Sequence, residues 1–166
     1  MSKYDWSKFV LRIPVRAPAV SIYRAWSTSE GIESWFLRSA EYRSGSDIIR
    51  HKNELIQKGD RYTWLWHGYD DDVVEINDVL EANDRDMISF VFAGHCIVIV
   101  TIGMLHSETI VELSQENIPT SEEAKVDIHM GCMEGWAFYL ANLKSILEGG
   151  IDLRNKNVTI GKMVNA

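Results

Sequence analysis

Cysteine is scarce in this sequence of 166 residues. The two cysteines, Cys96 and Cys132, lie far apart and provide no disulfide framework, so we expect a reducing compartment. Basic residues are also too few to balance the acidic ones, because 17 Lys and Arg stand against 24 Asp and Glu, for a formal charge of −7. This excess of negative charge disfavours nonspecific binding to nucleic acid or to an anionic membrane surface.

Several kinds of segment and motif are also missing. No apolar run approaches the length of a membrane span, and the first nine residues, which include Lys3, Asp5 and Lys8, do not form an apolar signal segment. The chain has neither a glycine-rich phosphate-binding loop nor the nucleophile elbow of a serine hydrolase. We therefore expect a cytoplasmic protein that binds no nucleic acid, does not insert into membranes and needs no cofactor.

The length and composition are those of one globular domain. The chain is long enough to bury a substantial core, and its 46% hydrophobic and 25% charged residues have the usual balance of soluble proteins. It contains no internal repeat, low-complexity tract or linker. We predict a single domain over residues 1–150, followed by a C-terminal tail over residues 151–166.

What the sequence does contain is a succession of strand patterns between helical ones. Phe9, Leu11, Ile13 and Val15 alternate with other residues, as in a half-buried strand. Further expected elements are short helices beginning near Pro18 and after a cap at Ser29, a short strand over 40–42, and strands over 62–67, 73–80, 88–92, 96–105 and 109–113. The pattern blurs between residues 45 and 59, and Asp70–Asp72 mark a solvated turn rather than a calcium site. Short strands joined by turns predict an antiparallel sheet and an α+β fold.

A long amphipathic helix is predicted over residues 122–150. Its apolar stripe, in steps of four and three residues, is Ile128, Cys132, Trp136, Tyr139, Leu143 and Ile146. Thr120 or Ser121 can cap its start, and Gly149 and Gly150 can end it. Glu134, Asn142 and Ser145 are expected on the opposite, polar side. Gly131 and Gly135 are either simply tolerated or mark a strip that a ligand or another backbone approaches closely.

Four segments, in this order, resemble a known family. They are Val15–Trp26 (VRAPAVSIYRAW), the pair Trp35-Phe36, the strand Ser107–Leu113 (SETIVEL), and the helix around Gly135-Trp136 with Leu140, Leu143 and Leu147. Together they are similar to the family named after the activator of Hsp90 ATPase, in the START/Bet v 1-like (SRPBCC, helix-grip) superfamily. The resemblance covers about residues 9–150, whereas the stretch over 45–59 is longer than in typical members and the tail is extra.

The resemblance implies a helix-grip fold, in which a curved antiparallel sheet wraps around the long C-terminal helix and two short helices follow the first strand. Members often hold apolar ligands in an internal cavity, and they include lipid and hormone carriers, polyketide cyclases, aromatases and co-chaperone domains. The fold therefore transfers from the family more safely than the function does.

Aromatic residues are the strongest chemical signal, because the chain has six tryptophans and each has a large apolar surface with one N–H group. In a helix-grip arrangement most of them would point inward, where they either fill the core or line a ligand pocket between sheet and helix. The candidate ligand-binding residues are Trp26, Trp35, Phe36, Trp64, Trp66, Phe90, Phe92, Cys132, Trp136 and Tyr139. Tyr62 shares a strand face with Trp64 and Trp66, so a crowded pocket would suit a compact aromatic or acyl group.

Candidate metal ligands and nucleophiles are less convincing. His129 and Cys132 lie three residues apart on the helix and His95-Cys96 can lie on the facing sheet, but the spacing is not that of a zinc site. A Cys–His nucleophile pair would lack a third orienting group. We therefore interpret the cysteines as small buried hydrophobes and predict no metal.

Four polar residues within the strand patterns, Glu75, Asn77, Glu112 and Ser114, are expected to face solvent; one that faced the cavity could orient a ligand or act as an acid or base. The preferred function is non-catalytic binding of a small apolar or aromatic molecule. One alternative is a protein-interaction module that resembles the Hsp90 co-chaperone domain and has a chaperone partner. Another is a cyclase, aromatase or hydrolase that uses the same cavity.

Overall fold

The computed structural model describes residues 3–166, and its element order is that of a helix-grip domain. The strands are β1 (Phe9–Pro14), β2 (Ser39–Arg43), β3 (Arg61–Leu65), β4 (Val74–Ala82), β5 (Met87–Phe92), β6 (Cys96–Leu105) and β7 (Glu108–Glu116). The helices are α1 (Ala19–Ser27), α2 (Ser29–Glu33), α3 (Glu122–Ala124), the π-helical segment η1 (Lys125–Met130), α4 (Gly131–Leu147) and the 3₁₀ turn η2 (Val158–Ile160). The predicted α+β fold class is confirmed.

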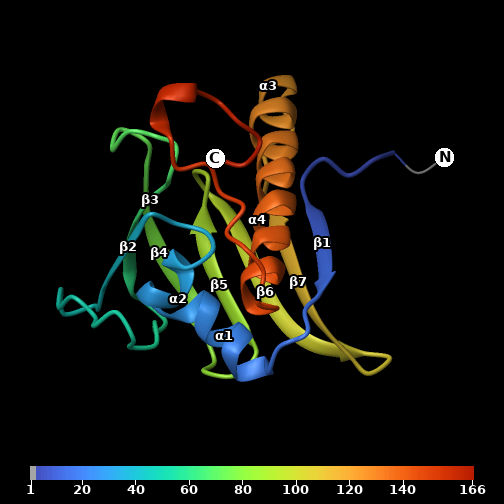
Figure 1. The fold of residues 1–166 in the computed structure, drawn as a ribbon. Helices are drawn as coiled ribbons and strands as arrows, with labels where there is room; N and C mark the ends of the chain where they lie inside the picture. The colour runs from blue at the N-terminus through green and yellow to red at the C-terminus, as the bar shows by residue number, and fades with distance from the viewer. Residues whose placement is uncertain (1–2) are drawn as a thin grey trace.

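The seven strands form one curved antiparallel sheet in the order β1-β7-β6-β5-β4-β3-β2 (Figure 1). Strands β2 to β7 follow one another as a meander, and β1 joins the far edge by pairing with β7, where Leu11 lies opposite Leu113. The register of β4 against β5 shifts between Val79 and Glu81, which is a β-bulge. Because a bulge increases local twist, it helps the sheet to curve around the helix.

Helices α3, η1 and α4 run on from one another as the long C-terminal helix, which crosses one face of the sheet (Figure 1). Ser121 caps its start by accepting a hydrogen bond from the Ala124 N–H, and Gly149 follows its end with a φ of 80°. The sequence predicted these boundaries but not η1, a π-helical turn of the kind that often occurs at functional sites.

Two predictions about the helices were wrong. Thr28, not Ser29, caps α2, because its side chain accepts a hydrogen bond from the Gly31 N–H. Asn142 was placed on the polar side of the long helix, but it is fully buried. Residues 151–154 return over that side, so Asn142 donates to the Trp35 carbonyl at 2.7 Å and accepts from the Leu153 N–H at 2.8 Å.

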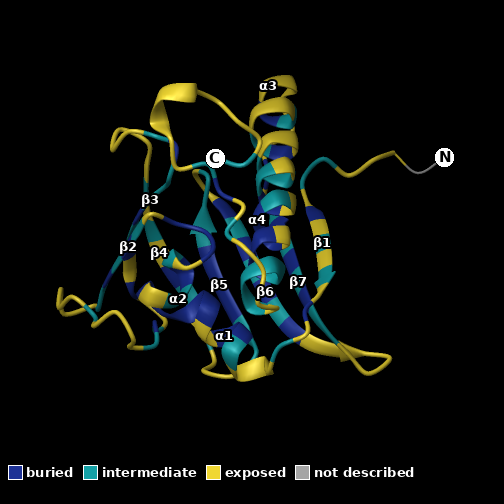
Figure 2. Cartoon of the chain, in the orientation of Figure 1, coloured by how far each residue is buried: buried dark blue, intermediate teal, exposed yellow. Residues whose placement is uncertain are grey.

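The core lies between the sheet and the helices on its concave face. Figure 2 shows buried residues gathering where α1, α4 and the strands meet, with exposed residues in the turns. Trp26 and Trp35 pack edge to face with ring centroids 4.5 Å apart, and Tyr62 stacks on Trp64 at 3.9 Å. All four rings are almost completely buried, so much of the aromatic content fills the core.

The segment over residues 45–59 packs on the domain through polar contacts and one apolar anchor. The guanidinium of Arg50 forms a two-pronged ion pair with the buried carboxylate of Asp60, and Ile56 is buried. The Ile56 N–H donates to the Ser27 carbonyl at 2.8 Å, which ties this segment to the end of α1.

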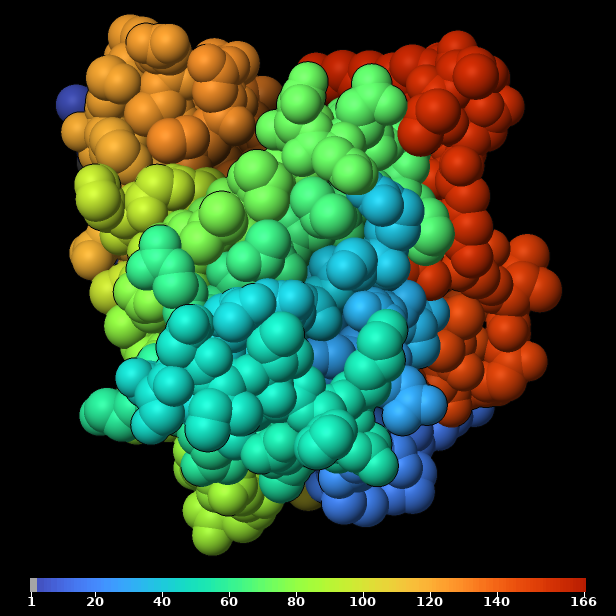
Figure 3. All heavy atoms as spheres, turned by 90° about the vertical axis from the view of Figure 1, so that its left-hand side faces the viewer, coloured from blue at the N-terminus to red at the C-terminus, as the bar shows by residue number. Residues whose placement is uncertain are grey.

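The C-terminal segment over residues 151–166 also lies against the domain. The buried guanidinium of Arg154 donates to the carbonyls of Glu33 and Leu37, each at 2.9 Å, and of Ser34 at 3.1 Å. Figure 3 shows this segment (red) running beside the β3–β4 loop (green) and the segment around α2 (blue). Within residues 3–166, no helix has both the length and the apolar character that a membrane crossing requires.

Candidate functional site

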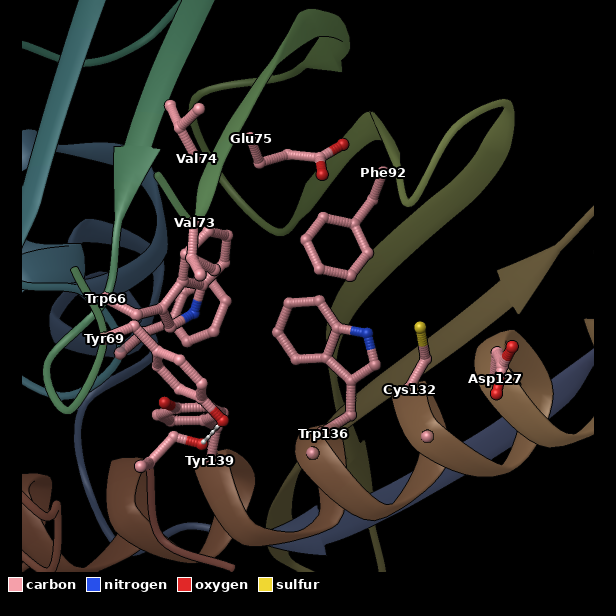
Figure 4. Close-up of a pocket in the computed structure, with 14 residues that line it drawn as sticks. Trp66, Tyr69, Val73, Val74, Glu75, Phe92, Asp127, Cys132, Trp136 and Tyr139 are labelled. Atoms are coloured by element: carbon pink, nitrogen blue, oxygen red, sulfur yellow. Dashed lines mark hydrogen bonds between the residues drawn. The ribbon is translucent and has the colours of Figure 1, made fainter. Parts of the chain in front are cut away.

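An open pocket of about 300 Å³ lies between α4 and the sheet, at the end where β3, β4 and β5 meet the C-terminal segment (Figure 4). Its walls combine aromatic rings with a few polar groups. The lining residues are Phe36, Trp66, Tyr69, Val73, Val74, Glu75, Phe92, Asp127, Gly131, Cys132, Gly135, Trp136, Tyr139 and Ala166.

Helix α4 supplies one wall of the pocket. Cys132, Trp136 and Tyr139 are spaced by four and three residues, so they project from the same face toward the sheet. Gly131 directly precedes Cys132 and Gly135 directly precedes Trp136, and a Cβ atom added at Gly135 would meet no atom within 4 Å. Gly135 therefore keeps space open beside the rings, while the close approach of a ligand there stays a prediction.

The opposite wall is mainly aromatic. Phe92 lies 5.2 Å from Trp136 between ring centroids, and Phe36 lies 4.9 Å from Trp136 and 4.7 Å from Tyr139. Trp66 extends this wall past the end of β3 and lies 6.5 Å from Phe92. The rings touch one another along the wall, so they form a continuous apolar surface on one side of an open space.

Glu75 brings a carboxylate to this surface, although it was expected to face solvent. The expectation was wrong because Ile76 lies exposed on the outer face of β4, whereas Glu75 shares the inner face with the buried Val79. The Glu75 Oε1 accepts hydrogen bonds from Asn77 Nδ2 at 2.6 Å and from the Ala93 N–H at 3.0 Å. By contrast, Glu112 forms an ion pair with Arg12, both partly exposed, as its predicted outward position requires.

The orientation of Trp136 depends on a residue that the sequence did not single out. Gln115 on β7 is fully buried, and its Oε1 accepts a hydrogen bond from Trp136 Nε1 at 3.0 Å. This bond fixes the indole with its ring along the pocket wall. Gln115 lies beyond the strand predicted over 109–113, and only its two-residue spacing from Val111 and Leu113 indicates an inward position, which does not reveal a hydrogen bond to a helix.

Cys132 and His129 do not form a reactive pair. Burial raises the pKa of the Cys132 thiol to about 11, although the neighbouring Gln115 amide opposes the effect. His129 is fully buried, and its nitrogens contact the Tyr4 hydroxyl at 2.8 Å and the Trp6 carbonyl at 2.9 Å. Across residues 3–166 there is no group of three or more His, Cys, Asp or Glu side chains that could hold a metal ion.

The structure separates the ten candidate ligand-binding residues into two sets. Six line the pocket, namely Phe36, Trp66, Phe92, Cys132, Trp136 and Tyr139. The other four, Trp26, Trp35, Trp64 and Phe90, are buried behind it, in contact with the lining rings. Tyr69 and Ala166 complete the rim, where the Tyr69 hydroxyl donates to the Ala166 carbonyl at 3.4 Å.

The sequence model of the family described as Activator of Hsp90 ATPase homolog 1-like protein matches residues 16–148. Protein SSP2350 from Staphylococcus saprophyticus has a similar structure, with a TM-score of 0.68, 20% identity, and coverage of 89% of this chain and 96% of that one. The Aha1 dimer from Colwellia psychrerythraea gives a TM-score of 0.64 and 19% identity over 86% of this chain and 97% of that one.

DynU16, a protein in the dynemicin biosynthetic locus, is similar with a TM-score of 0.62 and 15% identity, over 86% of this chain and 47% of that one. At identities this low the structural similarity shows a shared fold alone. No curated protein sequence matches the chain.

Proposed function

The chain belongs to the family of Activator of Hsp90 ATPase homolog 1-like proteins, and we propose that this START-like domain binds a small apolar or aromatic molecule without catalysis. The pocket between α4 and the sheet carries the proposal. Its volume of about 300 Å³ and its ring-lined wall suit a compact molecule better than a long lipid. The tightly packed rings behind it leave no room for a longer chain.

The chemistry of the pocket supports binding over catalysis. The Cys132 thiol is the nucleophile candidate there, and its pKa of about 11 keeps it protonated at neutral pH. His129, which would have to act as its base, is engaged with Tyr4 and Trp6 instead. A neutral thiol without a base does not initiate covalent catalysis.

Native mass spectrometry tests this proposal. Protein purified without denaturation is expected to carry a bound small molecule. In a Gly135→Leu variant the new side chain would occupy the open space beside Trp136, so the bound mass is expected to disappear. Ala137→Leu makes a similar change on the exposed side of α4 and is expected to retain the ligand. Ligand-free protein in all three cases would contradict the proposal.

A chaperone-binding module is the second candidate, and one observation favours it. The C-terminal segment exposes large apolar side chains, including Ile151, Val158, Ile160 and Val164. A stimulated ATPase rate of the cognate Hsp90-type chaperone at micromolar concentrations of this protein would support that candidate. If the Gly135→Leu variant, whose pocket is filled, stimulates the ATPase to the same rate as the wild type, the chaperone effect does not depend on ligand binding.

A further inference from the structure

The charged side chains that line the pocket are all acidic. Glu75 and Asp127 contribute carboxylates, and no Lys, Arg or His belongs to the lining. We infer that the ligand of this pocket is a small organic amine, protonated at neutral pH, that carries an aromatic or compact apolar group. The inference rests on the proposed function and adds the charge of the molecule that is bound.

Glu75 is prepared to receive a cation. Its Oε1 is held by Asn77 Nδ2 and the Ala93 N–H, so the carboxylate is fixed in place while Oε2 has no hydrogen-bond partner within residues 3–166. Figure 4 shows this carboxylate beside Phe92 at the edge of the pocket. A partly buried carboxylate is costly without a compensating charge, and a charge-assisted hydrogen bond from an ammonium group supplies one.

Two carboxylates that are more deeply withdrawn from solvent, or held in a packed loop, already have such a partner. Asp60 pairs with Arg50, and Asp152 pairs with Arg154 and Lys156. No basic side chain among the described residues forms an ion pair with Glu75, which stands at a pocket wall rather than in a packed loop. The missing cation is therefore the part of the arrangement that a ligand can provide.

The aromatic wall favours the same ligand charge. The faces of Trp, Tyr and Phe rings carry partial negative charge and attract cations, including organic ammonium groups. Phe92 lies 6.5 Å from Trp66 and 5.2 Å from Trp136 between ring centroids, and Figure 4 shows the Glu75 carboxylate next to Phe92. A carboxylate ligand such as a fatty acid would instead meet two acidic side chains and no basic one.

Three probes of nearly equal size test the inference: 2-phenylethylamine, 2-phenylethanol and phenylacetate, which are cationic, neutral and anionic at pH 7. Isothermal titration calorimetry is expected to show a Kd about tenfold lower for the amine than for the alcohol, since only the amine gains a charge-assisted bond. Phenylacetate is expected to bind more weakly than the alcohol.

Glu75→Gln keeps the acceptor oxygen that holds the strand but removes the charge, so the amine and the alcohol should then bind equally. Glu134→Gln makes the same substitution on the exposed side of α4 and should leave the preference unchanged. If Glu75→Gln does not fold, the wild-type comparison still decides. Equal binding of the three probes, or tighter binding of phenylacetate, would overturn the amine inference and leave the proposed function standing. Failure of all three to bind, with no co-purified molecule, would overturn both.

Discussion

Gly135 lies on the face of α4 that lines the pocket, and a Cβ atom there would meet nothing within 4 Å. Gly31 in α2 is the opposite case, because a Cβ atom would come within 2.1 Å of the Arg24 carbonyl oxygen. The two helical glycines are thus needed for different reasons. One leaves space for a ligand, and the other is required by close backbone packing.

Gly135→Ala is expected to raise the free energy of unfolding by about 1 kcal/mol, because alanine restricts the unfolded chain and has a higher helix propensity. Gly31→Ala is expected to lower it by roughly 1–3 kcal/mol through overpacking. Urea denaturation followed by circular dichroism measures both. A loss of stability in Gly135→Ala would show that the space beside Trp136 is not open.

The thiol of Cys132 offers a second test at the same scale. With a pKa of about 11 caused by burial, its thiolate fraction at pH 8 is roughly 100-fold lower than that of a free cysteine. Native protein is therefore expected to react with Ellman's reagent roughly 100-fold more slowly than the unfolded chain does at the same pH. In a Cys132→Ala variant, the remaining rate of reaction with Ellman's reagent is that of Cys96. A fast native reaction that Cys132→Ala removes would contradict the burial of this thiol.

At the scale of elements, the C-terminal segment is attached to α2 by one side chain. Arg154 donates to three carbonyls around the end of α2 and to both carboxylate oxygens of Asp152. This attachment places Ala166 at the rim of the pocket, where a Cβ atom on Gly68 would come within 2.7 Å of the Ala166 Cβ. The segment therefore shapes the mouth of the pocket from far along the chain.

Arg154→Met keeps the apolar stem but removes the guanidinium, and it leaves Asp152 and the α2 carbonyls without their donor. We expect the free energy of unfolding to fall by about 3 kcal/mol and hydrogen exchange over residues 155–166 to accelerate. Lys156→Met removes an exposed partner of Asp152 and is expected to cost less than about 0.5 kcal/mol. Equal effects of the two substitutions would show that Arg154 does not anchor the segment.

At the scale of the whole molecule, stability should decline in two steps as the pH falls. Burial, assisted by Arg154 and Lys156, lowers the pKa of His67. Burial opposes ionisation of Asp152, but hydrogen bonds from Arg154 and Lys156 outweigh it and hold the pKa of that carboxyl well below its usual range. For both groups the folded pKa lies below the unfolded one. Their stabilisation is thus complete above the unfolded pKa and is lost as the pH falls through the folded pKa.

Thermal unfolding between pH 8 and pH 3 is expected to show a small decrease in Tm that begins below about pH 6.5, from His67, and a larger one below about pH 4. His67→Gln should remove the first decrease and keep the second. A Tm that rises between pH 7 and pH 5 would contradict the assigned direction for His67.

Most elements could be predicted because their patterns are local. The alternation in β1 and the four- and three-residue steps through Trp136 depend on neighbours in the chain, so the succession of strands along the chain and the long helix followed from them, whereas the pairing of β1 with β7 did not. Glu75 was misplaced because alternation predicts that a charged residue faces solvent and its apolar neighbour faces inward, whereas Ile76 is exposed and Glu75 lines the pocket. Asn142 was misplaced because its partners come from the returning C-terminal segment.

Periodicity along the chain was enough to predict an α+β fold with an antiparallel sheet and a long C-terminal helix, because it is a property of nearby residues, and the resemblance of four ordered motifs to a known family implied the helix-grip arrangement. Which rings fill the core and which border open space was settled by contacts between distant elements. Trp26 and Trp136 are both apolar helix residues, yet only Trp136 borders the pocket, beside Gly135 and with its N–H held by Gln115. Space left open between packed side chains depends on the whole three-dimensional arrangement, and no local pattern encodes it.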